Sequence, residues 1–577
     1  MKKKLLPALI VTGLIILVVI IMGITALINK YTPTKMTEDL KEYFNISSDD
    51  EAALIVDNEL SDYKAKIIDK KIYVDYKFVH DSLNSRFYWD ANENVLLYTT
   101  ASDIISAAAD SNSYSVTKQT NDFGYPIVKA TSDSALIALD YVKQYSNITF
   151  KSYDDPARIV ITSKWDEIDS ATVSKSTQVR VKGGIKSPIL KELKKDDKIT
   201  ILDSGDKWDK IATEDGVIGY IKSKALSESK KTKLTNPDYE EETFTHIKKD
   251  KDICLAWNQV TSQSANSKVP QVISSTKGIN VMSPTWFYLN DNNGNLADIA
   301  SKDYVSYCHS QGIEVWGLFS NFENTDVDAA YVLTHTSTRT TLINQIMSAA
   351  FNYELDGVNI DFENITEAAY GDSYIEFIRE LAIKCHNNGI SLSVDVTVPA
   401  SFNKFFNRSD MANFADYIVI MGYDEHYKGS DAGSVSSIPW VTEGVESTLK
   451  EVPADQIILG MPFYTRIWEL TPKEDDDAVT DTEDQSKYTV ASQVYSMDAA
   501  AAQLATNNAT AALDEESGQN YAEWSVSNKL YKVWLEDTTS LEKRLKLVDD
   551  NKLAGAAFWK LGFENSSVWD TVIKYLN

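Results

Sequence analysis

The sequence is poor in the residues that form disulfide bonds and metal sites, with three cysteines and six histidines among 577 residues. Cys254, Cys308 and Cys385 lie far apart, in segments that read as one strand and two helices. This spacing does not indicate a disulfide framework or a thiolate zinc site, and it favours small buried side chains. The histidines show no HExxH or other ligand spacing. We therefore expect no catalytic metal and no cofactor.

The sequence also lacks an excess of positive charge, because its formal net charge at pH 7 is -27. A chain of this sign releases no counterions from phosphates, so we expect no nucleic-acid partner and no charge-driven binding to anionic headgroups. Any polymer that it grips is then held by shape and stacking. The apolar and charged fractions are ordinary, and the length predicts about three or four folded domains.

One long apolar run lies at the N-terminus, where residues 5–28 carry no charge and follow Lys2, Lys3 and Lys4. At about 1.5 Å per residue, a helix of this length crosses a hydrocarbon core about 30 Å thick. A cleavable signal peptide has a shorter apolar run and a small-x-small exit site, so we favour an uncleaved transmembrane anchor at residues 1–30. The lysines predict a cytoplasmic N-terminus and a single-pass membrane protein whose remaining residues are extracellular.

Residues 31–165 alternate short strand patterns with one helix pattern, which predicts an α+β domain. Two hairpins of similar shape are expected at 87–98 and 148–161, with a short buried helix over 135–142 between them. This weak duplication resembles copper amine oxidase N-terminal-like domains. The resemblance implies a wall-associated accessory module, and the lack of a histidine cluster argues against copper.

Residues 168–228 read as short strands with tight turns, at 179–181, 197–202, 208–211 and 216–221. The order VRVKGG, KKDDKITIL, WDKI and GVIGYI resembles bacterial SH3 domains. That resemblance implies binding to the cell wall, with Trp208 and Tyr220 as aromatic candidates; packing of both rings in a small barrel core is the alternative. The polar, lysine-rich residues 229–250 are expected to be a linker.

From residue 251 to 577 apolar strand patterns recur, and helix patterns such as the stripe over 374–385 fall between several of them. Such crossovers require parallel strands covered by helices, so the fold class is α/β and the expected architecture is a (β/α)₈ TIM barrel. Its active site would lie at the carboxyl ends of the strands. The eight expected strands are 253–257, 279–283, 313–319, 357–362, 391–398, 417–423, 457–461 and 555–559.

The fourth strand, DGVNIDFE at 356–363, places apolar residues on one face and Asn359, Asp361 and Glu363 on the other. If the apolar face meets the helices, the three polar side chains project into the barrel, where buried carboxylates are costly. A solvent-facing acidic strand in an antiparallel sheet is the alternative. Two neighbouring carboxyls, one of which holds a proton, suit general acid chemistry on a glycosidic oxygen.

These residues carry a specific resemblance. DGVNIDFE is similar to the DxxDxDxE signature of glycoside hydrolase family 18, the chitinase family. MGYD at 421–424 resembles its sixth-strand motif, and Trp559 in AAFWKLG its eighth-strand tryptophan. The segments SIPWVTEGV and VWLEDTTSLEKRLKLVDDNKLAGAAFWKLG look like the branch with spore cortex-lytic and cell-wall N-acetylglucosaminidases. The family's SxGG motif is absent from the third strand, which reads GLFSNF at 317–322.

The resemblance implies substrate-assisted, retaining hydrolysis of β-1,4 glycosidic bonds, an exception to the scheme with two catalytic carboxylates. Glu363 would protonate the leaving oxygen while the 2-acetamido carbonyl of the substrate attacks the anomeric carbon, and Glu363 would later activate the incoming water. Asp361 would stabilise the oxazolinium ion. Tyr423 and Asp424 would fix the acetamido group, and Trp559 would form an apolar floor under the sugar, although core packing is the alternative for both aromatic residues.

Asn359 stands where the family has its middle aspartate, so we expect Asp361 to lose a carboxylate neighbour, to gain an amide partner and to show a changed pH optimum. Met421 joins Asn359 among the expected substrate-binding positions. Asp356 and Gly357 begin the strand and are expected to be structural. Six further aromatic residues lie near strand ends, and ordinary packing is expected for each: Trp257, Trp286, Trp316, Trp440, Tyr464 and Trp468.

The expected substrate is a polysaccharide that contains N-acetylglucosamine, with peptidoglycan favoured because the anchor and the SH3-like segment tie the enzyme to its own envelope. A chitinase acting on chitin oligomers is an alternative. The stretch 465–528 is modest, acidic and alanine-rich, which favours an open groove over the deep tunnel that a large α+β insertion gives. A lectin on the same barrel is a further alternative, and the presence of Glu363 argues against it.

Overall fold

The computed structural model describes residues 5–363, 365, 370–473 and 484–576. The chain divides into two compact units. The N-terminal unit comprises Met1–Trp89, Ala107–Tyr114 and Asp122–Glu241, and the C-terminal unit comprises Asp90–Ser106, Ser115–Asn121 and Glu242–Asn577.

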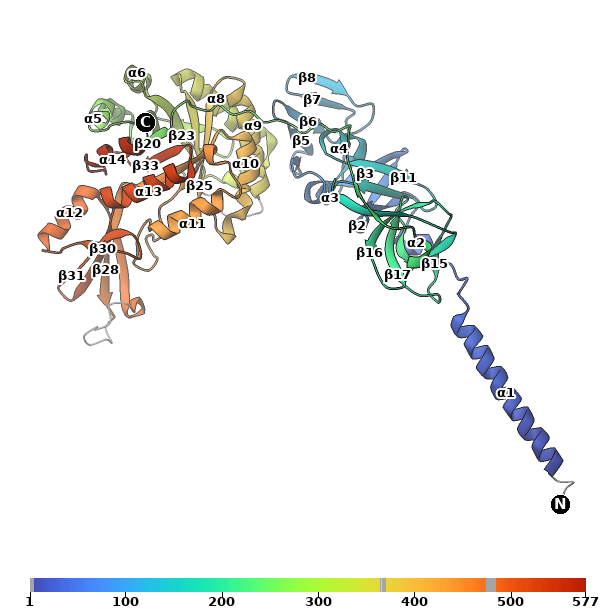
Figure 1. Ribbon diagram of the computed structural model, residues 1–577. Helices are drawn as coiled ribbons and strands as arrows, with labels where there is room; N and C mark the ends of the chain where they lie inside the picture. The colour runs from blue at the N-terminus through green and yellow to red at the C-terminus, as the bar shows by residue number, and fades with distance from the viewer. Residues whose placement is uncertain (1–4, 364, 366–369, 474–483, 577) are drawn as a thin grey trace. The chain divides into compact units, whose positions relative to one another are not determined.

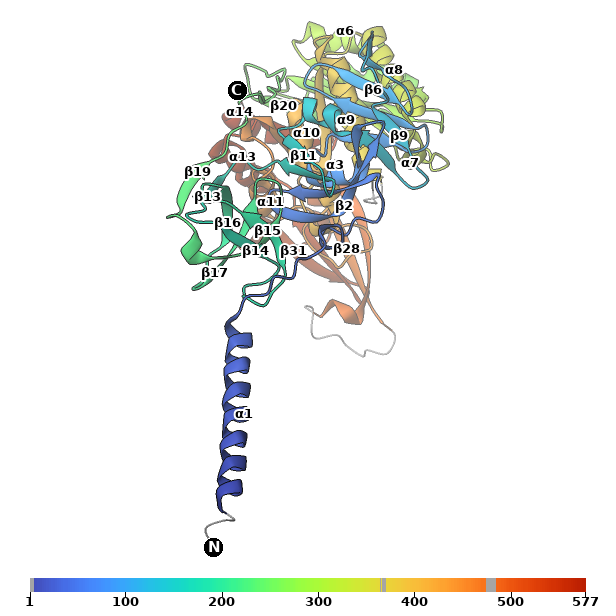
Figure 2. The ribbon, with the colours of Figure 1, turned by 90° about the vertical axis from the view of Figure 1, so that its right-hand side faces the viewer.

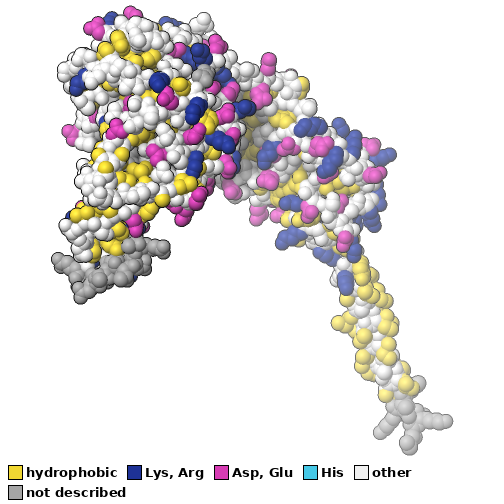
Figure 3. All heavy atoms as spheres, turned by 60° about the vertical axis from the view of Figure 1, so that its left-hand side comes forward, with side chains coloured by type: hydrophobic (Ala, Val, Ile, Leu, Met, Phe, Trp, Pro, Cys, Tyr) yellow, Lys and Arg dark blue, Asp and Glu magenta, His cyan; other side chains and the backbone are white. Residues whose placement is uncertain are grey.

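The N-terminal unit begins with α1 (Leu5–Tyr31), one uninterrupted helix (Figure 1, Figure 2). Its segment Pro7–Tyr31 has a mean hydropathy of 2.9, and hydrophobic side chains are exposed along its length (Figure 3). The helix is long and apolar enough to cross a membrane by length and composition. The three lysines expected on the cytoplasmic side lie outside the described residues.

A seven-stranded sheet follows, with α2 (Leu40–Tyr43), α3 (Tyr76–Ser82) and α4 (Leu139–Tyr145). The predicted hairpins are confirmed as β11 with β12 of this sheet, and as β4 (Phe87–Asp90) with β5 (Val95–Thr99), which belong to a separate five-stranded sheet. The helix predicted over 135–142 is wrong at its start, because 135–138 form β10 and a four-residue apolar run does not distinguish strand from helix. The sheet order is β11 (Thr149–Tyr153), β12 (Arg158–Thr162), β1 (Glu51–Val56), β2 (Glu59–Ile68), β3 (Lys71–Asp75), β10 (Ala135–Ala138) and β9 (Val128–Ala130).

The second seven-stranded sheet of this unit contains all four strands expected between residues 168 and 228. β15 was not expected, and β19 occupies the start of the stretch for which we expected a linker, where it pairs with β13 as a lysine-rich edge strand. Trp208 and Tyr220 are both half-buried and pack near Gly183. The order is β15 (Ile189–Leu193), β14 (Thr177–Arg180), β18 (Ile218–Lys222), β17 (Trp208–Thr213), β16 (Lys198–Asp203), β13 (Glu167–Thr172) and β19 (Lys230–Lys233).

The C-terminal unit contains a closed barrel of eight parallel strands, which confirms the expected architecture (Figure 1). The first strand pairs in parallel with both the second and the last, and this closes the ring. The strands are β20 (Ile253–Asn258), β21 (Val281–Leu289), β23 (Glu314–Ser320), β24 (Gly357–Asp361), β25 (Ser391–Thr397), β26 (Tyr417–Met421), β27 (Ile457–Pro462) and β33 (Gly555–Trp559).

Helices cover the outside of the barrel, as crossovers between parallel strands require (Figure 1). The helix predicted over 374–385 is confirmed as α9, and the ring of Phe362 stacks on Phe377 of this helix at 5.4 Å. Cys254, Cys308 and Cys385 are free and buried, as expected. The described helices are α5 (Val269–Ile273), α6 (Lys302–Ser310), α7 (Ala329–Thr334), α8 (Thr336–Tyr353), α9 (Gly371–His386), α10 (Arg408–Phe414), α11 (Ile438–Thr448), α13 (Thr538–Asn551) and α14 (Val568–Tyr575).

An insertion between the seventh and eighth barrel strands forms an α+β subdomain of its own. Its strands β28 (Tyr464–Pro472), β29 (Tyr488–Ser496), β30 (Ala512–Asp514), β31 (Gln519–Val526) and β32 (Lys529–Leu535) form an antiparallel sheet with α12 (Met497–Thr506). The expectation of a stretch too modest for such a subdomain is wrong, because strands with alternating apolar and polar residues lie on both sides of 474–483, which are outside the described residues. The size of this stretch therefore no longer favours an open groove.

Residues 90–106, which we expected in the accessory domain, group with the barrel. The buried carboxylate of Asp90 accepts hydrogen bonds from the Thr336 backbone N–H at 2.7 Å and from its hydroxyl at 2.6 Å, at the start of α8. Ser337 donates its backbone N–H to Glu93 at 3.0 Å. Because the first turn of a helix has unpaired N–H groups, this hairpin caps α8 from a distant part of the chain.

Candidate active site

The polar face of β24 points into the barrel. Val358, Ile360 and Phe362 belong to the apolar cluster that packs between strands and helices. Asn359 and Asp361 are buried on the opposite face, and Glu363 is exposed just after the end of the strand. Parallel pairing of β24 with β23 and β25 excludes the antiparallel alternative. The site therefore lies at the carboxyl ends of the strands, as expected for this barrel.

Asn359 is the centre of a buried hydrogen-bond network. Its Oδ1 accepts from Trp257 Nε1 and from Ser283 Oγ, each at 2.9 Å. Its Nδ2 donates to Ser393 Oγ at 3.1 Å and to Asp395 Oδ1 at 2.7 Å. The expected hydrogen bond from the Asn359 amide to Asp361 is therefore wrong. The amide donates to side chains of the neighbouring strand β25 instead of to a residue of its own strand.

Asp361 has a second carboxylate neighbour after all. Both Asp361 and Asp395 are buried, and Oδ1 of Asp361 accepts no hydrogen bond from the described residues. Burial raises the pKa of Asp361 well above its usual range, and the charges of Asp395, Glu363 and Glu323 raise it further. Burial also raises the pKa of Asp395, whereas the hydrogen bond from Asn359 opposes that rise. Because two close buried charges of one sign are costly, burial favours the neutral form of these carboxyls.

The sequence contained a signal for Asp395 that motif matching passed over. In SLSVDVT at 391–397 the polar residues alternate with apolar ones, as they do in the fourth strand. That alternation places Ser393 and Asp395 on the interior face. Glu323, which follows β23, had no comparable signal, and the structure shows it accepting a hydrogen bond from Ser320 Oγ at 2.6 Å.

Glu363 lies at the mouth of the barrel with acidic groups around it. Partial burial against the protein raises its pKa, and the charges of Asp424 and Glu323 add to the rise. A carboxyl with a raised pKa keeps its proton closer to neutral pH, which is the property that a general acid needs. Glu363 and Asp361 lie two residues apart at the carboxyl end of β24, and the charge of Glu363 raises the pKa of Asp361, so the two carboxyls form one electrostatically linked group.

The sixth strand brings the MGYD segment to the same end of the barrel. Met421 ends β26 and is half-buried. Burial raises the pKa of Tyr423 well above its usual range, and the charges of Asp361 and Asp395 raise it further, so the phenol stays protonated and available as a donor. Asp424 accepts a hydrogen bond from Tyr464 Oη at 2.6 Å and lies 3.6 Å from Arg466 Nη2.

Aromatic rings lie beside these groups. Trp257 is buried in the barrel, and its ring centroid lies 6.5 Å from that of Tyr423 and 6.0 Å from that of Trp559. Tyr423 and Trp559 are only half-buried, so part of each ring remains accessible at the mouth. The packing expected for the other aromatic residues is confirmed by burial for Trp257, Trp286, Trp316, Trp468 and Tyr464, while Trp440 is half-buried.

Asp356 and Gly357 lie at the opposite end of β24 from Glu363. Asp356 accepts the backbone N–H of Val315 at 2.8 Å and pairs with Nε2 of His309 at 2.7 Å. A Cβ at Gly357 would lie 2.5 Å from Cδ1 of Trp316, so a larger residue has no room there. Both contacts fit residues that hold the barrel together.

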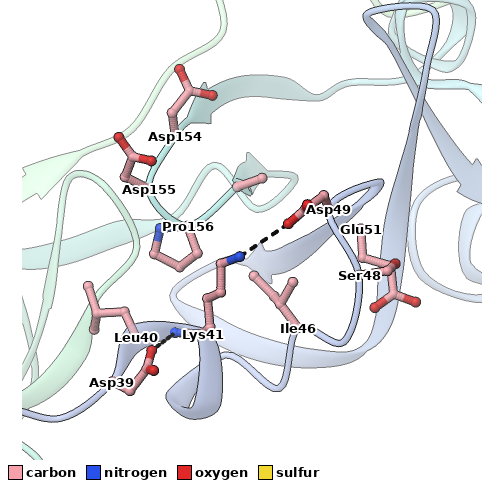
Figure 4. Close-up of a pocket in the computed structure, with 11 residues that line it drawn as sticks. Asp39, Leu40, Lys41, Ile46, Ser48, Asp49, Glu51, Asp154, Asp155 and Pro156 are labelled. Atoms are coloured by element: carbon pink, nitrogen blue, oxygen red, sulfur yellow. Dashed lines mark hydrogen bonds and ion pairs between the residues drawn. The ribbon is translucent and has the colours of Figure 1, made fainter.

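A cavity of about 480 Å³ lies in the N-terminal unit (Figure 4). Its lining includes Asp39, Lys41, Asp49 and Asp154, and the ammonium of Lys41 pairs with Asp49 at 3.2 Å. Asp39, Asp49 and Asp154 are all exposed to solvent, so these carboxylates are not prepared for acid catalysis. In the described ranges of the chain, no group of three or more His, Cys, Asp or Glu residues is placed to hold a metal ion.

Comparison with known sequences supports the same region. Residues 308–564 match the Glycosyl hydrolases family 18. The uncharacterized glycosylase YvbX of Bacillus subtilis is 24% identical over 302 residues, which are 49% of this chain and 81% of the relative. The cortical fragment-lytic enzyme of Bacillus subtilis is 24% identical over 287 residues, which cover 48% of this chain and 63% of the relative. Probable di-N-acetylchitobiase 2 of Dictyostelium discoideum is 23% identical over 252 residues, covering 38% and 66%.

Among solved structures, the spore cortex-lytic enzyme SleL of Bacillus megaterium is similar with a TM-score of 0.49 and 19% identity, covering 61% of this chain and 78% of that one. The family match rests on sequence, and it includes the fourth, sixth and eighth barrel strands. The chain is therefore a glycosidase whose C-terminal unit contains a glycoside hydrolase family 18 domain.

Proposed function

We propose that this protein hydrolyses β-1,4 glycosidic bonds of N-acetylglucosamine-containing polysaccharide, with peptidoglycan as the substrate, by a substrate-assisted retaining mechanism. The observation that carries the proposal is the electrostatically linked group at the barrel mouth. There, Glu363 follows the buried Asp361 at the carboxyl end of the fourth strand, and the pKa of each carboxyl is raised. The protonated phenol of Tyr423 belongs to the same group.

The first half of the reaction breaks the glycosidic bond. Glu363 donates its proton to the leaving oxygen, and the carbonyl oxygen of the substrate's 2-acetamido group bonds to the anomeric carbon from the other face. The product is a cyclic oxazolinium ion, whose positive charge an ionised Asp361 stabilises through the acetamido N–H. In the second half, Glu363 takes a proton from water as the water oxygen attacks the anomeric carbon. The ring opens, and two inversions give net retention.

The remaining groups hold the acetamido sugar in place. The Tyr423 hydroxyl donates to the acetamido carbonyl oxygen, and the accessible parts of Tyr423 and Trp559 present apolar surface to the sugar. Asp424, fixed by Tyr464, keeps the pKa of Glu363 raised. Asn359 and Met421 belong to the same end of the barrel; Asn359 is buried beneath the site and acts through its hydrogen bonds.

Peptidoglycan is preferred to chitin because relatives include enzymes named for cortical fragments, and because an anchor and a wall-binding module would keep the enzyme at its own envelope. We propose that α1 is a single-pass membrane anchor and that the catalytic unit lies outside the cell. The SH3-like segment, through Trp208 and Tyr220, is proposed to bind the wall. The α+β insertion and the relative named as a chitobiase favour chitin oligomers as the second candidate.

The test uses the full-length protein in detergent, with purified peptidoglycan and with chitin oligomers, and identifies new reducing ends by mass spectrometry. Reducing-end N-acetylglucosamine from the wall is the expected product. Muramic acid ends, or turnover of chitin alone, would contradict the choice of substrate. Tight glycan binding with no new reducing ends would instead indicate a lectin.

A further inference from the structure

The fifth barrel strand carries a carboxylate that the mechanism above does not use. Asp395 in β25 is buried in the barrel interior and accepts a 2.7 Å hydrogen bond from Asn359 Nδ2. Position 359 holds an amide where the resembled signature has an aspartate. The interior therefore keeps a carboxylate and an amide in contact, with the carboxylate on the neighbouring strand.

The surroundings of Asp361 determine which member of this group is charged. The titratable groups near Asp361 are Asp395 on β25, Glu363 after β24, Glu323 after β23, Tyr423 after β26 and Tyr374 on α9. Both tyrosines have strongly raised pKa values and stay neutral. Among the charges, that of Asp395 has the largest effect on Asp361.

Hydrogen bonding stabilises the ionised form of one of the two buried aspartates more than that of the other. Asn359 donates to Asp395, which favours the ionised form of that carboxyl. Oδ1 of Asp361 accepts no hydrogen bond from the described part of the chain, so at this oxygen no donor there favours the ionised form. Burial disfavours the charged form of both carboxyls, and the hydrogen bond from Asn359 favours Asp395 as the one that ionises first.

We propose that Asp395 is a positioning residue that sets the protonation state of Asp361, and so replaces from β25 the carboxylate that β24 lacks at position 359. It acts through Asp361 and does not touch the sugar. The inference rests on the proposed function only for the contact between Asp361 and the substrate.

The first test compares Asp395→Asn, Asn359→Asp and the double swap in plots of kcat/KM against pH. Removing the charge at 395 should move the acidic limb, where Asp361 ionises, about one pH unit or more toward acid, since strongly interacting sites differ by at least that much. Asn359→Asp alone adds a carboxylate and should move the limb the other way. The double swap restores one carboxylate and one amide, so it should return the limb to near the wild-type position.

The second test needs no substrate. Infrared spectra of the free protein near neutral pH should show a protonated-carboxyl band that Asp361→Asn removes. Asp395→Asn should also remove it, because Asp361 would then ionise, and the double swap should retain it. Thermal unfolding of each variant controls for the fold.

An unchanged acidic limb and an unchanged infrared band in Asp395→Asn would overturn the inference, because burial alone would then protonate Asp361. A lower rate without a shifted limb, and without rescue by the swap, would also overturn it, since that is the result of a purely structural role. Failure of the proposed function is distinguishable: full activity in Glu363→Gln would refute the mechanism while leaving the infrared result intact.

Discussion

Replacing Glu363 by Gln removes the proposed proton donor and keeps the size of the side chain. Glu363 is exposed at the barrel mouth, so the substitution should leave the fold intact. General acid catalysis contributes roughly 10²- to 10⁴-fold to rate, which is about 3 to 5 kcal/mol at 1.36 kcal/mol per factor of ten. Because the raised pKa of Glu363 keeps the proton in place toward neutral pH, we expect the full loss for a sugar leaving group at that pH.

The assay compares two β-glycosides of an N-acetylglucosamine oligomer, one with a sugar leaving group and one with a nitrophenolate. Nitrophenolate leaves without protonation, so Glu363→Gln should lose far less rate on that substrate. Asp356→Asn is the matched control, because Asp356 lies at the other end of the same strand and bonds the Val315 N–H. It should change stability without changing the dependence on the leaving group. An equal loss on both substrates in Glu363→Gln would refute proton donation by this residue.

Three further results are expected. Glu323→Gln removes a charge that raises the pKa of Glu363, so the alkaline limb of the kcat profile should move to lower pH; an unmoved limb would contradict this electrostatic link. Asp90→Ala removes the acceptor of the two Thr336 hydrogen bonds and should lower the free energy of unfolding of the C-terminal unit by about 2 kcal/mol in urea titrations. An unchanged urea midpoint would show that these hydrogen bonds do not stabilise the unit. Asp361→Asn should raise Tm near neutral pH. The folded state binds more protons than the unfolded state between the ordinary pKa of 3.8 and the raised one, so wild-type stability falls as pH rises through that window, and the gain should vanish below it.

The barrel was predictable because its strands are buried on both faces and are separated by helices. Runs of this kind, such as 417–423, are too apolar for surface strands, and the crossovers fix their direction. The insertion was not predictable, because its alternating strands and alanine-rich helix carry weaker patterns. The helix prediction at 135–138 was wrong for a related reason, since four apolar residues fit a strand as well as a helical turn.

At the site, alternation along one strand predicted that Asn359 and Asp361 point into the barrel, and the structure confirms their burial there. The partner of Asn359 was predicted wrongly, because contacts between strands depend on the stagger of the closed barrel, which one strand's sequence does not contain. For Asp395, alternation along the fifth strand does predict an interior position, but its contact with Asn359 on the neighbouring strand is not contained in the sequence of either strand alone.

In the proposed mechanism the acetamido group of the substrate acts as the nucleophile. The direct measurement is the hydrolysis rate of nitrophenyl β-glycosides whose 2-acetamido group carries none, one, two or three fluorine atoms. Fluorine withdraws electrons from the carbonyl oxygen, so the rate should fall steeply at each step if that oxygen attacks the anomeric carbon. A rate that stays the same across the series would contradict substrate assistance and require a nucleophile from the protein or from water.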